Sequence, residues 1–152
     1  MPVVVGTVAE IGLDYLGFAG RVGRRGALTF PERVRPESLE VGVRWITVFE
    51  PAADFSNLDD ECLQGIKARL RPVVASLRAK GPFRMIMVSS SEASARLIER
   101  WRSITVADPT YPSDPEGARS IEEACIRHGL AAGEAVAVKA EIERDFRDAM
   151  RL

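Results

Sequence analysis

Three consecutive serines, Ser89, Ser90 and Ser91, are the side chains whose type and position best suit the binding of a small molecule. They follow the apolar run 83–88 and precede a segment with helical periodicity. Hydroxyl groups and the backbone N–H groups of a helix N-terminus can together hold a phosphate or a carboxylate. Helix capping is the alternative role, because Glu92 stands three residues after Ser89, which is the spacing of a capping box.

A second polar group, made of carboxylates and one hydroxyl, follows the apolar run 43–49. Its members are Glu50, Asp54, Ser56, Asp59, Asp60 and Glu61. Ligands of open α/β sheets bind at the carboxyl ends of the strands, so we predict that Asp54 and Ser56 share a ligand site with the three serines. Carboxylates could hold Mg²⁺ at the same edge, but capping of the next helix explains the acids nearest to it. The sequence therefore predicts no metal ion and no cofactor.

Side chains suited to catalysis are few. His128 is the only histidine, and no GxSxG-like motif presents a serine nucleophile. The place of His128 in the last turn of a helical segment, before Gly129, favours a structural role. Cys62 and Cys125 have no partner at metal-ligand spacing, and the acids beside Cys62 disfavour its thiolate. We therefore predict no catalytic residue and a protein that is not an enzyme.

The composition is that of an ordinary globular protein. Apolar residues make up 46% and charged residues 28% of the 152 residues, enough to bury a core. With 21 basic and 22 acidic residues, the net charge of −1 gives no overall attraction for nucleic acid or anionic lipid. No apolar run approaches the roughly 20 residues of a membrane span, and the N-terminal residues do not read as a signal peptide. We expect a soluble protein of the bacterial cytoplasm.

The hydrophobic periodicity predicts an α/β fold with a mixed sheet of about four to five strands, helices packed on it and an extra C-terminal helix. The predicted strands are a hairpin of 2–9 and 13–20, two buried strands at 43–49 and 83–88, and a short strand at 104–106. The predicted helices are 58–80, bent or split by Pro72, one opening at Ser89, one opening at Ser120 with Glu123 in a capping box, and 132–150.

The remaining segments are less regular. Residues 21–42 are predicted to hold a short strand near Ala27–Phe30 and a short helix around Glu37, and DPTYPSDPEG is predicted to be a loop. We interpret residues 1–152 as one domain. It consists of an N-terminal hairpin with an irregular connection (1–42), a strand–helix–strand–helix core (43–130) and a C-terminal amphipathic helix (131–152).

Three stretches of the chain resemble the SpoIIAA-like, or STAS-like, domain family in the order of their strands and helices. They are VRPESLEVGVRWITVFEPAADFSNLDDECLQGI, GPFRMIMVSSSEASARLIERW and YPSDPEGARSIEEACIRHGL. The resemblance implies a binding or regulatory module of a bacterial group and not an enzyme. Signalling members carry a phosphorylatable serine in an Asp-Ser-Ser-Gly stretch. Here the corresponding region reads SNLDDECL, and Ser56 stands several residues too early, so a kinase-controlled switch is not implied.

These observations lead to three hypotheses of function. The first is a non-catalytic interaction or regulatory module that self-associates, through the C-terminal helix or a sheet edge, or that binds another protein. The second is a carrier or sensor of a small anionic or lipid-like ligand, which would require a cavity between the strand ends and the long helix. The third and weakest is a metal-dependent enzyme that uses the acidic group.

Overall fold

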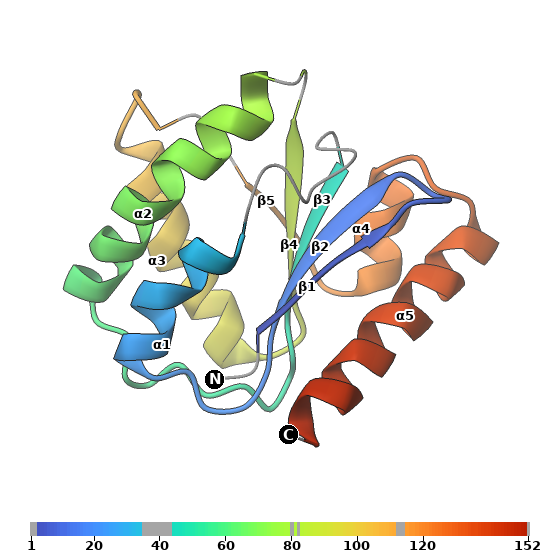
Figure 1. The fold of residues 1–152 in the computed structure, drawn as a ribbon, viewed down its shortest axis with the longest axis horizontal. Coiled ribbons are helices and arrows are strands. Elements are labelled where there is room, and N and C mark those ends of the chain that lie inside the picture. Colours follow the sequence, from blue (N-terminus) through green and yellow to red (C-terminus); the bar gives the residue numbers. More distant parts are fainter. Residues whose placement is uncertain (1–2, 35–43, 80, 82, 112–114, 152) are drawn as a thin grey trace.

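The computed structural model describes residues 3–34, 44–79, 81, 83–111 and 115–151 (Figure 1). Along the chain the elements are β1 (Val3–Val8), β2 (Leu13–Phe18), α1 (Arg24–Thr29), the 3-10 helix η1 (Phe30–Arg33), β3 (Arg44–Phe49), α2 (Asp60–Ala79), β4 (Arg84–Ser89), α3 (Glu92–Val106), β5 (Glu116–Ala118), α4 (Ile121–Arg127) and α5 (Ala132–Met150). The predicted α/β class, with a mixed sheet and a C-terminal helix, is confirmed.

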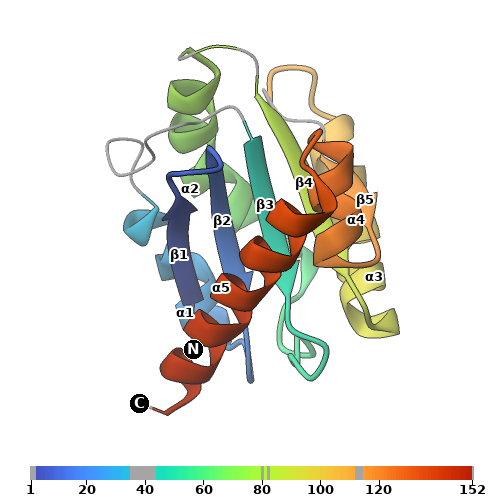
Figure 2. The same ribbon diagram turned by 90° about the vertical axis from the view of Figure 1, so that its right-hand side faces the viewer.

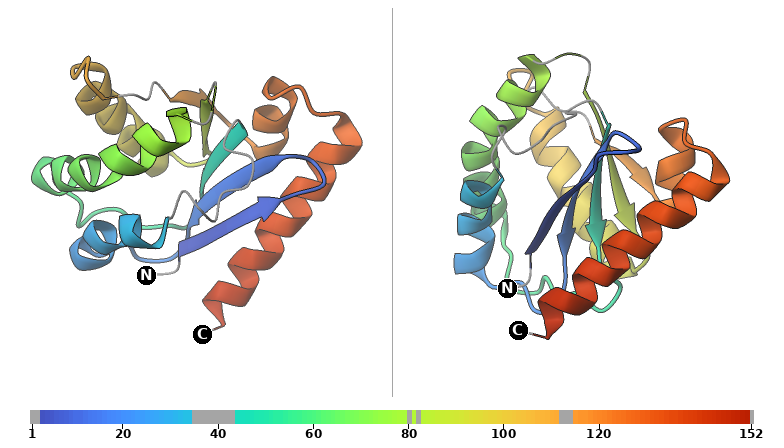
Figure 3. Two further views of the ribbon diagram at one scale, coloured as in Figure 1. Left: turned by 45° about the horizontal axis from the view of Figure 1, so that its top comes forward. Right: turned by 45° about the vertical axis from the view of Figure 1, so that its right-hand side comes forward.

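The strands lie in the sheet in the order in which they occur in the chain. β1 pairs antiparallel with β2, and β2, β3, β4 and β5 are parallel to one another. The register aligns the ends of three strands, because Phe18 pairs with Phe49 and Phe49 pairs with Ser89. Three helices, α1, α2 and α3, cover one face of this sheet, while α4 and α5 cover the other (Figure 3).

The central strands are buried on both faces. In β3, Trp45 and Phe49 belong to the core under α1, α2 and α3, whereas Ile46 and Val48 belong to the core under α4 and α5. β4 alternates in the same way, since Ile86 and Val88 face α4 and α5. Two-sided burial explains why these segments are continuous apolar runs rather than alternating patterns.

The C-terminal helix packs against its own domain. Figure 2 shows α5 lying diagonally across the sheet, where it contacts β1, β2 and α4. Its predicted apolar stripe, Ala135, Val138, Ile142 and Phe146, is buried in the core on this face. The stripe is therefore occupied within one chain and does not supply the interface that the self-association hypothesis had assigned to it.

Two strand glycines make room for the rings that lie under α5. A Cβ atom on Gly17 would lie 2.7 Å from two carbon atoms of the Phe146 ring. A Cβ atom on Gly6 would lie 2.3 Å from the hydroxyl oxygen of Tyr15, which donates a hydrogen bond to the carboxylate of Asp145 on α5. Small residues at these positions are thus a condition for the helix to approach the sheet.

The long helix α2 runs through Pro72 without interruption, so the predicted split does not occur. Proline cannot donate an N–H to the carbonyl four residues earlier, which belongs to Ala68. Both Pro72 and Ala68 are exposed, so this carbonyl lies on the side of the helix that water can reach. The opposite side carries the predicted stripe, in which Leu63, Ile66, Val74 and Leu77 are buried.

Three predicted elements of the irregular segments are wrong. Ala27–Phe30 is helical, within α1 and the start of η1, because Ala27 donates to the carbonyl of Gly23 and begins a helical turn. Residues 104–106 are the last turn of α3 rather than a strand. The predicted loop DPTYPSDPEG contains the start of β5, which pairs with β4 at the sheet edge. The helix predicted around Glu37 lies outside the described residues.

The helix caps confirm Ser120 as an N-cap, although Glu123 accepts from the N–H of Arg119 rather than that of Ser120, and they correct the cap predicted at Ser89. Ser120 caps α4, where its Oγ accepts from the N–H of Glu123, as predicted. α3 begins two residues later than predicted, because β4 extends to Ser89 and the N-cap is Ser91. At the end of α4, Gly129 has a φ of 82° and the N–H of Leu130 donates to the carbonyl of Cys125, which forms a C-terminal glycine motif.

Replacement of Gly17 by alanine is expected to lower the free energy of unfolding by about 1–3 kcal/mol, because the added Cβ overlaps the Phe146 ring. Gly117→Ala in β5 is the matched control, since a Cβ there has no atom within 4 Å. Urea denaturation of both variants measures the difference. Equal stability of the two variants would show that α5 does not depend on this contact.

Candidate functional site

Two of the three predicted serines, Ser89 and Ser91, form a hydroxyl cluster with Ser94 at the start of α3. The Oγ of Ser91 accepts from the N–H of Ser94 at 3.2 Å, and the two hydroxyls are 2.7 Å apart. The Oγ of Ser89 lies 3.1 Å from the Ser94 hydroxyl and 3.2 Å from the carbonyl oxygen of Ser91. Ser90 is exposed. Capping, the alternative role, is confirmed for Ser91, although Glu92 takes no part in it.

Asp54 and Ser56 lie in the loop between β3 and α2, and their contacts hold that loop to the end of β2. The backbone of Asp54 donates to the carbonyl of Gly20 and accepts from the N–H of Val22. Its side chain accepts from the N–H of Ser56 at 2.9 Å, and this hydrogen bond is the main reason that the pKa of Asp54 lies below its usual value. Both side chains are exposed.

The carboxyl ends of β3 and β4 border a groove of about 430 Å³ on the side of α4 and α5. Of the five predicted ligand-binding residues, only Ser90 lines it, so the structure does not bring them together in one cavity. Lys139 crosses the groove wall to Glu122 at 2.7 Å, which raises the pKa of Lys139 and lowers that of Glu122. The groove is lined by three cationic and three anionic side chains, which gives no preference for an anion. They are Arg119, Lys139, Arg147, Glu50, Glu122 and Glu143.

The acidic residues before α2 cap the helix and pair with arginines. The Oδ1 of Asp59 accepts from the N–H of Cys62 at 2.8 Å, while its Oδ2 lies 3.0 Å from Arg24 on α1. Asp60 pairs with Arg100 on α3 at 2.9 Å. Among the described residues no group of three or more histidine, cysteine or acidic side chains could hold a metal ion. These contacts account for the acids nearest the helix by capping and ion pairing.

The single histidine and the two cysteines are buried. The Nε2 of His128, the C-cap residue of α4, lies 3.1 Å from the carbonyl oxygen of Trp45 and so joins this helix to β3. Burial lowers the pKa of His128 below its usual value. Burial also raises the pKa of Cys62 and raises that of Cys125 to about 11, so both thiols stay protonated near neutral pH.

A second cavity lies on the other face, between the sheet and α1, α2 and α3. Its volume is about 90 Å³. The walls are almost wholly apolar: Phe18, Met85 and Met87 project from the sheet, and Leu70 and Val74 project from α2. We call this space the apolar cavity. The carrier hypothesis required a cavity between the strand ends and the long helix. This cavity lies under that helix, but none of the five predicted ligand-binding residues lines it.

The polar groups in the wall of the apolar cavity are engaged or weakly polar. The indole N–H of Trp45 donates to the hydroxyl of Thr47 at 2.8 Å, so it is not directed at a ligand. Burial raises the pKa of Tyr111, the third polar group, to about 12, which keeps its hydroxyl neutral near pH 7. A water molecule needs two to four polar partners, so these walls favour an apolar occupant.

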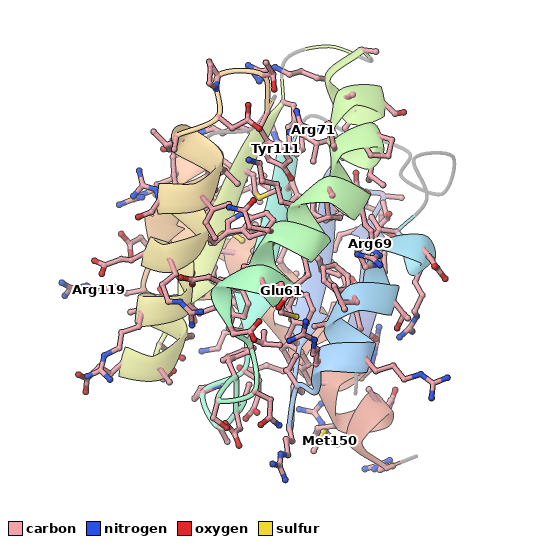
Figure 4. All side chains as sticks on the ribbon, turned by 90° about the vertical axis from the view of Figure 1, so that its left-hand side faces the viewer. Glu61, Arg69, Arg71, Tyr111, Arg119 and Met150 are labelled. Carbon is pink, nitrogen blue, oxygen red and sulfur yellow. The ribbon has the colours of Figure 1, made fainter. Side chains whose placement is uncertain are left out.

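Beside Tyr111, which lines the apolar cavity, lies a set of polar contacts, here called the Asp108 cluster: Lys67, Arg71, Asp108, Thr110 and Tyr111. The Oδ2 of Asp108 lies 2.8 Å from Lys67 and 2.6 Å from Arg71, and its Oδ1 accepts from the N–H and the hydroxyl of Thr110. Both cations also face the Tyr111 ring, at 5.8 and 5.5 Å from its centroid. Figure 4 shows Arg71, which belongs to α2, and Tyr111 side by side.

The cluster is more buried than an ordinary surface ion pair. Lys67 is only 8% exposed, and Tyr111, 6% exposed, packs edge-on against Trp101 on α3. The two cations and the Thr110 hydroxyl hold the pKa of Asp108 far below its usual value. The cluster therefore fixes the loop after α3 against α2, beside residues that line the apolar cavity.

The sequence analysis missed the Asp108 cluster. Asp108 and Tyr111 were assigned to a loop without a role, and Lys67 and Arg71 were among the polar positions of an amphipathic helix. The residues lie toward the amino ends of the parallel strands, opposite to the edge on which the prediction concentrated. One signal was available, because Lys67 and Arg71 are four residues apart and so lie on one side of the helix.

The comparisons with known proteins add no relative. No family model matches the chain, and no curated protein or solved structure matches it. The resemblance to the SpoIIAA-like family therefore stays a prediction. Among the described residues, no helix is long and apolar enough to cross a membrane.

The stability of the fold is expected to fall as the pH falls through about 6.5, the usual pKa of histidine. The pKa of His128 is lowered in the folded state, so in this range the unfolded chain binds the additional proton and protonation favours unfolding. Urea denaturation between about pH 8 and pH 5 measures the loss. His128→Gln keeps a donor for Trp45 and should remove the pH dependence, since no other histidine is present. An imidazole that titrates above the usual value by NMR would contradict this prediction.

Proposed function

We propose that the protein binds a small, mainly apolar molecule in the apolar cavity and acts as a carrier or sensor of it. The observation that carries the proposal is a cavity of about 90 Å³ within the core of one layer. At roughly 24 cal/mol per Å³, a cavity of this size lowers stability by about 2 kcal/mol when nothing fills it. Such a loss is a large fraction of the stability of a small domain, and a bound ligand offsets it.

The chemistry of the walls supports binding by burial of apolar surface. The lining residues come from β2, β3 and β4 on one side and from α1, η1, α2 and α3 on the other, so a ligand would lie between the sheet and these helices. Burial of apolar area contributes about 25 cal/mol per Å². An engineered apolar cavity of about 150 Å³ holds benzene, so this one suits a short or branched hydrocarbon group.

The same walls support carriage or sensing rather than conversion. Among the described residues that line the cavity there is no histidine, cysteine, carboxylate or ammonium group, and only Thr47 and Tyr111 bear a hydroxyl. Acid–base or nucleophilic catalysis would need such a group within hydrogen-bonding reach of the ligand. A binding module is also what the resemblance to the SpoIIAA-like family implies.

Partial filling of the apolar cavity is expected to stabilise the protein and to weaken binding. Val74→Leu adds one methylene group to the wall formed by α2 and should raise the free energy of unfolding by up to about 1 kcal/mol. Val138→Leu is the matched control, because Val138, on α5, is fully buried and does not line the cavity. Overpacking there should lower stability by about 1–3 kcal/mol.

Binding itself can be measured with 1-hexanol as the probe, by its effect on the methyl resonances of the cavity residues. The wild-type protein should bind 1-hexanol and gain thermal stability, while Val74→Leu should bind it more weakly. The proposal fails if 1-hexanol perturbs no cavity methyl group, or if Val74→Leu is destabilised as much as Val138→Leu.

The sheet edge at β1 favours a second candidate, self-association. Among the described strands, β1 lies at one edge of the sheet, and its sequence VVVGTV contains no charged residue. Four of its six residues are only half-buried. An uncharged edge strand of this length offers unpaired backbone groups to a strand from a second copy.

A lysine in the middle of β1 should prevent edge pairing. We expect the wild-type protein to be a dimer by light scattering coupled to size-exclusion chromatography, and Val5→Lys to be a monomer with the same circular dichroism spectrum. Val136→Lys is the control, because Val136 is 64% exposed on α5 and away from this edge. A monomeric wild-type protein at high concentration would show the candidate to be wrong.

A further inference from the structure

We infer that the ligand of the apolar cavity is an amphiphile with a single carboxylate, whose head group binds Lys67 and Arg71 while its apolar part enters the cavity. This inference rests on the proposed function and adds the class of ligand to it. The Asp108 cluster carries it, because it places two cations and one carboxylate beside Tyr111, a residue of the cavity wall.

The position of the cations fits a head group next to the cavity. Lys67 and Arg71 lie on α2 on either side of Leu70 in sequence, and Leu70 lines the cavity. The ammonium and the guanidinium group are 5.8 and 5.5 Å from the centroid of the Tyr111 ring, which also lines it. A carboxylate bound at these two groups would thus lie next to Tyr111, a residue of the cavity wall.

The donors are already arranged around a carboxylate. The Oδ2 atom of Asp108 occupies the point between Lys67 and Arg71, at 2.8 and 2.6 Å, and Arg71 also donates to the hydroxyl of Thr110 at 3.0 Å. A ligand carboxylate would find the same charge-assisted donors if it displaced the Asp108 carboxylate from this position or bound beside it.

The charge balance of the cluster favours an anion. Within the part of the chain that the structure describes, two cations face one carboxylate, which leaves one positive charge. Lys67 is 8% exposed, so this charge is poorly screened by water. A neutral apolar ligand would leave this positive charge in place, whereas a ligand with one negative charge would neutralise it.

Hexanoate and 1-hexanol are the probes that separate this inference from the proposed function, since they share the chain and differ in the charge of the head group. Their dissociation constants at neutral pH are measured by NMR for the wild-type protein and for three variants. Lys67→Met keeps the stem of the side chain without its charge, and Asp108→Asn frees both cations. Glu99→Gln, on the exposed side of α3, makes the same change in net charge as Asp108→Asn and is its control.

The wild-type protein should bind hexanoate more tightly than 1-hexanol. Lys67→Met should weaken hexanoate binding by at least about tenfold, and Asp108→Asn should strengthen it by about tenfold, with little change for 1-hexanol. Glu99→Gln should behave as the wild-type protein. The gain expected for Asp108→Asn cannot arise from loss of folding.

Two results would overturn the inference while the proposed function stands: equal affinity for both probes in every variant, or an equal gain for both probes in Asp108→Asn, which would mean that the substitution only opens the cavity. If neither probe binds the wild-type protein, the proposed function fails and this inference fails with it.

Discussion

Trp45 and Ile46 are neighbours on β3, yet their side chains are buried in opposite layers of the molecule. Each layer depends on this strand and on β4 beside it, because both strands place large apolar side chains on both faces. A sheet of this kind is stable only when both faces are covered. The helices that connect the parallel strands cover one face, so α4 and α5 must cover the other.

The two layers meet this requirement differently. Under α5 the fit is close, since Gly6 and Gly17 leave only the space that the rings of Tyr15 and Phe146 fill. Under α2 the fit leaves the apolar cavity, and the Asp108 cluster lies beside its wall at Tyr111. Buried ion pairs contribute little net stability, because the loss of hydration offsets much of the attraction. The cluster is better explained by the loop that it holds and by the charge that it presents there.

Much of the fold could be predicted from local patterns. The continuous apolar runs of β3 and β4 indicated strands that are buried on both faces. The apolar stripes of α2 and α5 indicated helices that are buried on one side. The errors fell where the local pattern is weak. Glu116–Ala118 is a strand only because β4 offers it a free edge, and Pro72 is accepted within α2 because its missing hydrogen bond lies on the solvent side. The N-cap was predictable at Ser120. The cap predicted at Ser89 lies instead at Ser91, because pairing with β3 extends β4 to Ser89.

The sequence alone determined the class of fold, the α4 cap and the buried structural place of His128, because these depend on neighbours within a few residues or on burial that composition requires. The tertiary structure decided that α5 packs on its own sheet, that Ser89 and Asp54 serve local hydrogen bonds, and that Lys67 meets Asp108. These contacts join residues far apart in the chain, and their partners depend on strand order and on how closely each helix approaches the sheet. A cavity leaves no mark in a sequence, because it is the volume that packed side chains fail to fill.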